Sequence, residues 1–130
     1  SMLATLNKYP QMAEDFSIAL MIWEDYEHAL EMIERIFQPV TKSWLKAECL
    51  LQSRKFIELL EVLDSVDVFV SQDSELVFAQ NYMRAQAYWG LEKKNTAIEL
   101  LEQIVEARPN YRSAQVLLTH WKENIIWLNE

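Results

Sequence analysis

Apolar residues recur along most of the chain at intervals of three and four positions, the spacing that gathers them on one face of an α-helix. Short polar segments, such as EDY at 24–26 and SRK at 53–55, interrupt this pattern. It predicts seven helices, over 11–23, 27–37, 42–52, 56–66, 75–90, 96–108 and 110–128. In the first two, the residues expected to face inward are Met12, Phe16, Ala19, Leu20 and Trp23, followed by Ala29, Ile33, Ile36 and Phe37.

Residues that favour helix ends stand between these segments. We expect prolines to end the second and sixth helices, a glycine to close the fifth, and short polar side chains to cap the helices that follow. The alternating segment VDVFV at 66–70 would suit a strand, but a lone strand has no partner, so we expect a helix end and a connection there. The expected helix-ending residues are Pro39, Gly90 and Pro109, and the expected N-caps are Thr41, Asp73 or Ser74, Asn95 and Asn110.

The first six helices form three pairs that repeat one pattern. The second helix of each pair carries a marker near its start, Ala29, Leu59 or Ala97, at intervals of 30 and 38 residues with a mean of 34. Small residues in the first helices would let two helix backbones approach closely, as a helical hairpin requires. We therefore expect three further sets of residues to be buried at fixed distances from the markers: Ser17, Ala47 and Ala85; Ile33, Leu63 and Leu101; and Ile36, Val66 and Ile104.

Residues 78–111 resemble a tetratricopeptide repeat, through Ala85, Tyr88, Ala97, Leu101, Ile104 and Pro109. DYEHAL and RKFIEL resemble degenerate forms of its turn and second-helix start, so the resemblance covers roughly residues 10–128. It implies an all-α fold of stacked antiparallel helical hairpins in a right-handed superhelix. The expected organisation is a single domain over 1–130, with repeats near 10–39, 40–73 and 78–111 and a capping helix at 110–128. A non-repetitive helical bundle is the alternative.

The chain departs from the family pattern at four places. Leu59 stands where a small residue is usual, Gly90 lies two residues before the usual turn glycine, and Thr41 stands where proline is expected. A four-residue gap also precedes the third pair. These departures predict irregular repeats and a locally distorted superhelix.

Composition narrows the function classes. The 130 residues include 12 basic and 20 acidic side chains, a net charge of −8, without a basic stripe, so we expect no binding of nucleic acid or of an anionic membrane. The longest apolar run, IALMIW at 18–23, is too short to span a bilayer. The single cysteine, Cys49, allows no intrachain disulfide and is expected to be buried.

The setting of the protein is suggested by its N-terminus and its cysteine content. No signal peptide is visible and one cysteine fits a reducing compartment, so we expect a cytoplasmic protein. The opening Ser-Met resembles a sequence left by recombinant expression, which suggests a fragment of a longer protein.

Catalytic and metal-binding motifs are not recognisable in the sequence. His28 and His120 lie on different predicted helices and form no metal-ligand spacing with Cys49. One glycine cannot build a phosphate-binding loop, and no nucleophile–base motif emerges. We therefore expect a non-enzymatic protein without a cofactor or a metal.

The resemblance implies that the first helix of each pair lines a concave groove that binds a partner peptide or helix. This lining is aromatic, apolar and acidic, so the expected partner is a protein segment that is apolar with some basic residues. Trp44, Tyr82 and Trp89 are candidate hot spots, although aromatic residues at helical spacing suit a core equally well. The implied groove residues are Gln11, Glu14, Ile18, Met21, Ile22, Trp44, Glu48, Leu51, Gln52, Ala79, Tyr82, Gln86 and Trp89, and the last helix can add Val116, His120 and Glu123.

Two alternatives to an adaptor stay open. The segments YEHALEMIERIF and WLKAECLLQSRKFIELLEVLD resemble the N-terminal dimerising repeats of anaphase-promoting complex scaffold subunits, which implies a self-associating subunit. Leu3 and Leu6, together with Ile126 and Trp127 in the consecutive apolar tail, are candidate contacts of such a homodimer. The other alternative is a secretion or assembly chaperone of this fold that keeps a client protein soluble.

Overall fold

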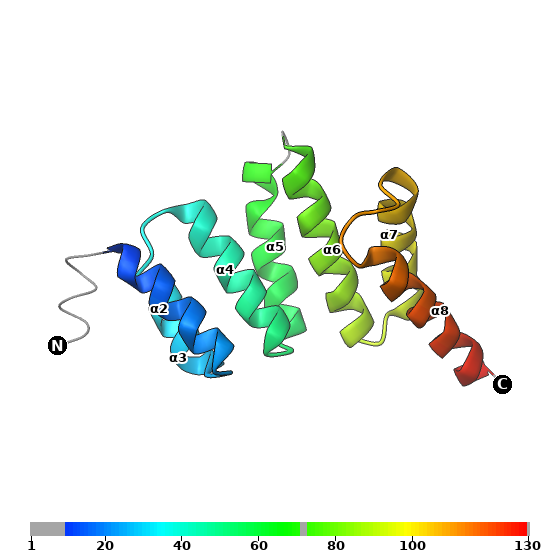
Figure 1. Ribbon diagram of the computed structural model, residues 1–130, viewed down its shortest axis with the longest axis horizontal. Coiled ribbons are helices and arrows are strands. Elements are labelled where there is room, and N and C mark those ends of the chain that lie inside the picture. Colours follow the sequence, from blue (N-terminus) through cyan, green and yellow to red (C-terminus); the bar gives the residue numbers. More distant parts are fainter. Residues whose placement is uncertain (1–9, 71–72, 130) are drawn as a thin grey trace. The chain divides into compact units, whose positions relative to one another are not determined.

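The computed structural model describes the backbone of residues 10–70 and 73–129 and the side chains of residues 11–66 and 73–125. Within these residues the chain is all-helical and forms no strand, which confirms the predicted fold class (Figure 1). The seven helices are α2 (Pro10–Ile22), α3 (Tyr26–Ile33), α4 (Pro39–Gln52), α5 (Phe56–Val70), α6 (Ser74–Gly90), α7 (Lys94–Ala107) and α8 (Ala114–Asn129).

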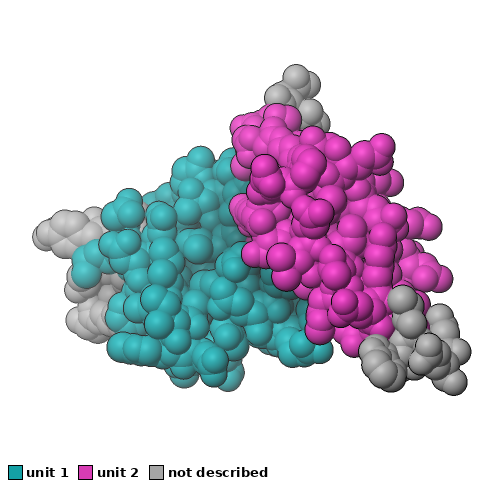
Figure 2. All heavy atoms as spheres, turned by 45° about the vertical axis from the view of Figure 1, so that its right-hand side comes forward, with its two compact units in different colours: residues 1–66 teal, residues 67–130 magenta. Residues whose placement is uncertain are grey.

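The chain divides into two compact units, residues 1–66 and 67–130, with the boundary inside α5 (Figure 2). In the first unit α2 packs on α3 and α3 packs on α4, and side chains of all three helices share one core. In the second unit α6 packs on α7 and α7 packs on α8 around a second core. Consecutive helices thus pack as neighbouring hairpins, as predicted, while the single-domain organisation and the right-handed superhelix stay predictions.

The markers of the three helix pairs, and the residues at fixed distances from them, are all buried as predicted. The three markers Ala29, Leu59 and Ala97 have no solvent exposure. The other nine predicted positions are also buried: Ser17, Ala47, Ala85, Ile33, Leu63, Leu101, Ile36, Val66 and Ile104. Ser17 satisfies its hydroxyl by donating a hydrogen bond to the Ala13 carbonyl oxygen at 2.6 Å. The fixed distances from the markers therefore identify the buried face of each of the six paired helices.

Periodicity alone gave the wrong inward face for α2. Trp23, expected inside, is 74% exposed, and Met12 and Phe16 are exposed as well. Of the residues predicted from periodicity, Leu20 is buried, and it shares the buried face with Ala13, Ser17 and Met21. The error has a physical cause, since α2 carries apolar residues on nearly every side and a helical wheel cannot select one stripe among them.

The start of α4 also differs from the prediction. Pro39 does not end the preceding helix but is the first residue of α4, where its missing N–H costs nothing. The N-cap is Gln38, whose side-chain oxygen accepts a hydrogen bond from the Thr41 N–H at 2.6 Å, so Thr41 is not the cap. Because α3 already ends at Ile33, Phe37 lies beyond it and is 74% exposed rather than inward-facing.

At the remaining helix ends, some of the predicted capping residues are confirmed and others were wrong. Asp73 caps α6 as predicted, because its carboxylate accepts hydrogen bonds from the backbone N–H groups of Glu75 and Leu76. Pro109 follows the end of α7 at Ala107. The predictions for Asn95 and Asn110 were wrong, since α7 begins at Lys94 without a side-chain cap and α8 begins only at Ala114. The segment 66–70 is the helical end of α5.

The first and second helices of all three pairs are joined by the same turn. Glu24, Arg54 and Glu92 adopt left-handed backbone conformations, with φ of 61°, 62° and 65°. Glu92 stands at the position where the resemblance to a tetratricopeptide repeat implies a turn glycine, whereas Gly90 ends α6 without a positive φ. The same two backbone hydrogen bonds recur around these three residues. In the first turn, the Glu24 N–H donates to the Met21 carbonyl oxygen and the Asp25 N–H donates to the Leu20 carbonyl oxygen. The equivalent bonds join Arg54 to Leu51 and Lys55 to Leu50 in the second turn, and Glu92 to Trp89 and Lys93 to Tyr88 in the third.

Cys49 is a buried structural residue, as predicted. Its thiol has no solvent exposure and donates to the Tyr26 carbonyl oxygen, with 3.7 Å between sulfur and oxygen. Burial raises the pKa of the Cys49 thiol, which disfavours the reactive thiolate.

Replacing the exposed Glu24 by glycine is predicted to stabilise the protein. A left-handed conformation is costly for a residue with a Cβ atom and not for glycine, so Glu24→Gly should raise the free energy of unfolding by roughly 0.5–1 kcal/mol. Denaturant unfolding measures the change. Glu24→Ala is the control, because it removes the carboxylate but keeps the Cβ atom; a glycine variant no more stable than the alanine variant would contradict the backbone argument.

Replacing Leu59 by alanine is predicted to destabilise the protein, although the resemblance to a tetratricopeptide repeat implies a small residue at this position. Leu59 is fully buried, so truncating it leaves a cavity and should cost about 2–5 kcal/mol of the free energy of unfolding. The neighbouring Leu60→Ala substitution, at a half-buried position of the same helix, serves as the control with a smaller expected loss. Equal losses in the two variants would show that Leu59 has no special packing role.

Candidate partner-binding surfaces

The α2 part of the predicted groove contains exposed apolar side chains. Ile18 is 40% exposed and Ile22, one helical turn later, is 73% exposed. On the same side of the helix the Gln11 side-chain amide donates to the Glu14 carboxylate at 3.5 Å. Met21, which was also predicted to line the groove, is only 7% exposed and belongs to the core of the first unit. The exposed surface of α2 is therefore apolar with an acidic neighbour.

The α4 part of the predicted groove is half-buried. Trp44, Glu48 and Leu51 are all of intermediate exposure. The Glu48 carboxylate accepts a hydrogen bond from the Gln52 side-chain amide at 3.1 Å, which holds both polar groups along the helix. The indole Nε1 of Trp44 is buried and finds no acceptor among the described residues. A buried donor without an acceptor is uncommon and costs about 1–3 kcal/mol.

The α6 residues of the predicted groove are built into the second unit. Tyr82 is buried, and the Gln86 side-chain amide donates to the Tyr82 carbonyl oxygen at 3.3 Å. The Trp89 ring stacks on the buried Trp121 of α8, with ring centroids 4.6 Å apart and planes inclined by 4°. The Lys94 ammonium lies 4.9 Å from the centroid of the Trp89 ring. Trp89 therefore links α6 to α8, as a packing residue does.

The two histidines lie in separate local settings. His120 is exposed on α8, with its Nε2 3.3 Å from the Asn124 side-chain nitrogen. The His28 ring is 2.9 Å from the Asp25 carboxylate, which also accepts a hydrogen bond from the His28 backbone N–H as the N-cap of α3. The hydrogen bond with Asp25 raises the pKa of His28. Across the described residues no group of three or more metal-ligating side chains comes together.

An arginine–aromatic cluster in the second unit was not predicted from the sequence. Phe78 and Tyr82 of α6 pack around Tyr111, with ring centroids 5.6 and 5.7 Å from it. Arg108 lies over the Phe78 ring and pairs with Glu75, and Arg112 lies over the rings of Tyr82 and Tyr111. Through these contacts the loop between α7 and α8, residues 108–113, packs against α6. The available signal was the pair of arginines flanking Tyr111.

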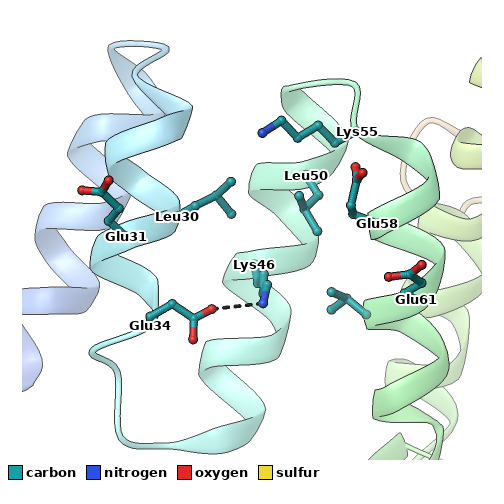
Figure 3. Close-up of a pocket in the computed structure, with 9 residues that line it drawn as sticks. Leu30, Glu31, Glu34, Lys46, Leu50, Lys55, Glu58 and Glu61 are labelled. Atoms are coloured by element: carbon teal, nitrogen blue, oxygen red, sulfur yellow. Dashed lines mark hydrogen bonds and ion pairs between the residues drawn. The ribbon is translucent and has the colours of Figure 1, made fainter.

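A cleft in the first unit was also missed (Figure 3). It encloses about 610 Å³ between α3, α4 and α5, with apolar residues Leu30, Leu50 and Val62. The charged residues around it are Glu31, Glu34, Glu58, Glu61, Lys46 and Lys55. None of the predicted groove residues lines it. Because the cleft needs residues from three helices, no short sequence motif could have revealed it.

Glu34 is the one lining carboxylate that is neutralised by ion pairs. It lies 3.0 Å from the Lys46 ammonium and 3.2 Å from the Lys42 ammonium. The hydrogen bond from Lys46 lowers the pKa of the Glu34 carboxyl, so this group stays ionised. Glu31, Glu58 and Glu61 have no ion-pair partner among the described residues.

The structure does not describe the side chains of the residues predicted for self-association. Leu3 and Leu6 lie outside the described residues, and the side chains of Ile126 and Trp127 at the end of α8 are likewise outside them.

Comparison with protein-family models, curated proteins and solved structures gave no match to this chain. The tetratricopeptide assignment therefore stays a prediction that rests on the residue pattern. No helix among the described residues is both long enough and apolar enough to cross a membrane.

Substituting Trp89 is predicted to destabilise the protein. Trp89→Ala removes the stack on the buried Trp121 and should lower the free energy of unfolding by about 2–3 kcal/mol. Trp89→Phe is the control, because a smaller aromatic ring retains part of the stack and should lose less. Chemical denaturation followed by circular dichroism distinguishes the variants, and an alanine variant as stable as the original protein would show that the stack contributes nothing.

Proposed function

We propose that this chain is a non-enzymatic protein-interaction module, which binds a partner polypeptide segment on the exposed faces of the first helices of its hairpins. The observation that carries the proposal is the exposure of Ile18 and Ile22, two branched apolar side chains one turn apart on α2. Exposed apolar side chains at this spacing suit a partner that brings an apolar strip of its own. The acidic neighbour Glu14 favours a partner segment that also carries Lys or Arg.

The indole of Trp44 supports the same proposal. Its N–H lacks an acceptor among the described residues, and its side chain is only half-buried. A partner carbonyl that reached this N–H after a small rotation of the side chain would recover part of the cost of the unpaired donor. Trp44 is therefore the aromatic residue that we expect to contact a partner, whereas Trp89 and Tyr82 hold the second unit together.

Replacing the exposed isoleucines is predicted to abolish partner binding without unfolding the protein. The full chain and its Ile18→Asp/Ile22→Asp variant are each immobilised, and proteins captured from a cell extract are quantified by mass spectrometry. The matched control is Phe37→Asp/Ile57→Asp, which alters two similarly exposed apolar residues of the same unit.

A partner should be captured by the original protein and by the control, and should be depleted about tenfold or more with the isoleucine variant. Circular dichroism establishes that both variants are folded. Equal capture by the two variants would contradict the proposed surface.

The second candidate function, a self-associating subunit, is favoured by a different feature of α2. Met12 and Phe16 of α2 and Trp23, the residue that follows the helix, recur at intervals of four and seven residues and are all exposed. This is the spacing of a seam between two packed helices. Sedimentation of the original chain against Phe16→Glu/Trp23→Glu separates the candidates: a dimer lost in the variant supports self-association, and a monomer at high concentration removes it.

A further inference from the structure

The cleft between α3, α4 and α5 shares no lining residue with the groove proposed above. Its floor and walls supply three apolar side chains, Leu30, Leu50 and Val62. Its volume of about 610 Å³ falls in the range of cavities that hold a ligand of a few side chains. In Figure 3, Leu30 points from α3 toward α4, and Glu58 and Glu61 project from α5 on the opposite side of the cleft.

The charge around this cleft is unbalanced. Lys46 forms an ion pair with Glu34, with 3.0 Å between nitrogen and oxygen. Lys42, which does not line the cleft, forms a second ion pair with the same carboxylate. This leaves Glu31, Glu58 and Glu61 without ion-pair partners among the described residues, against the single ammonium of Lys55. An occupant that brings positive charge to the α5 side would therefore gain electrostatic complementarity.

We propose that this cleft binds a segment of a partner protein in which apolar side chains are flanked by lysine or arginine. The apolar side chains would contact Leu30, Leu50 and Val62, and the flanking basic groups would pair with Glu58 and Glu61. Nucleic acids and anionic membranes are disfavoured, because their phosphates would meet these carboxylates. A second copy of the chain is the less favoured occupant of this cleft, because a chain with 20 acidic and 12 basic residues supplies fewer basic groups to pair with these carboxylates.

The probe for this proposal is the acetylated and amidated peptide Lys-Lys-Leu-Leu-Lys-Lys. Two comparison peptides replace either both leucines by serine or all lysines by glutamate. Binding to the full chain is followed by backbone amide chemical shifts up to about 1 mM peptide, the weak end of specific affinities. We expect the largest shifts at the backbone amides of Leu30, Leu50 and Val62, and much weaker binding of both comparison peptides.

Charge reversal on α5 provides the decisive variant. Glu58→Lys/Glu61→Lys should weaken binding of the probe about tenfold or more, because two attractive contacts become repulsive. The matched control is Glu99→Lys/Glu106→Lys, which makes the same change in net charge at two exposed positions of α7. At an ionic strength near 0.15 M this control should bind within about twofold of the original protein, because it changes the net charge equally and alters no residue that lines the cleft.

Several outcomes would overturn the proposal. They are no binding up to about 1 mM, equal binding of the serine peptide, equal weakening by both charge reversals, or amide shifts confined to other residues. Shifts on α2 alone would support the groove of the proposed function and reject the cleft, so the two surfaces fail separately. A dimer that disappears in Glu58→Lys/Glu61→Lys would identify a second copy as the occupant and would also reject the proposal.

Discussion

Close packing of paired helices at small side chains is the constraint on which the rest of this structure depends. Ser17, Ala47 and Ala85 are buried in the first helices, and Ala29 and Ala97 are buried in the second helices. Small residues allow helix backbones to approach, and the larger residues of each seam can then fill the space between them. With their inward faces fixed in this way, the helices leave defined outer faces, and the outer face of α2 carries the exposed Ile18 and Ile22.

The turns between paired helices share one backbone geometry although none has glycine at its left-handed position. Glu24, Arg54 and Glu92 adopt the left-handed conformation that glycine would adopt at lower cost. The same pair of backbone hydrogen bonds closes each helix end, so backbone bonding retains the turn in the absence of glycine. For this reason the spacing of the markers predicted the paired helices, whereas the position of the glycine did not predict the turn. Gly90 was expected to close its helix, but the left-handed residue of the turn is Glu92.

The sequence was sufficient to predict the helices and their buried positions wherever the repeat gave a register. It was insufficient for α2 taken alone, because the stripe predicted from periodicity included Phe16 and Trp23, which are exposed, as well as Leu20, which is buried. The candidate surfaces were harder to predict for a related reason. Trp89 meets Trp121, and Leu30 shares a cleft with Val62, through packing between helices that no local pattern encodes.

Hydrogen–deuterium exchange on the complex between this chain and a captured partner tests the central claim most directly. The account predicts that the partner slows exchange in α2 and in α4, the helices that carry Ile18, Ile22 and Trp44. Exchange in these helices that is unchanged by the bound partner, with slowing confined to other parts of the chain, would contradict the assignment of the binding surface.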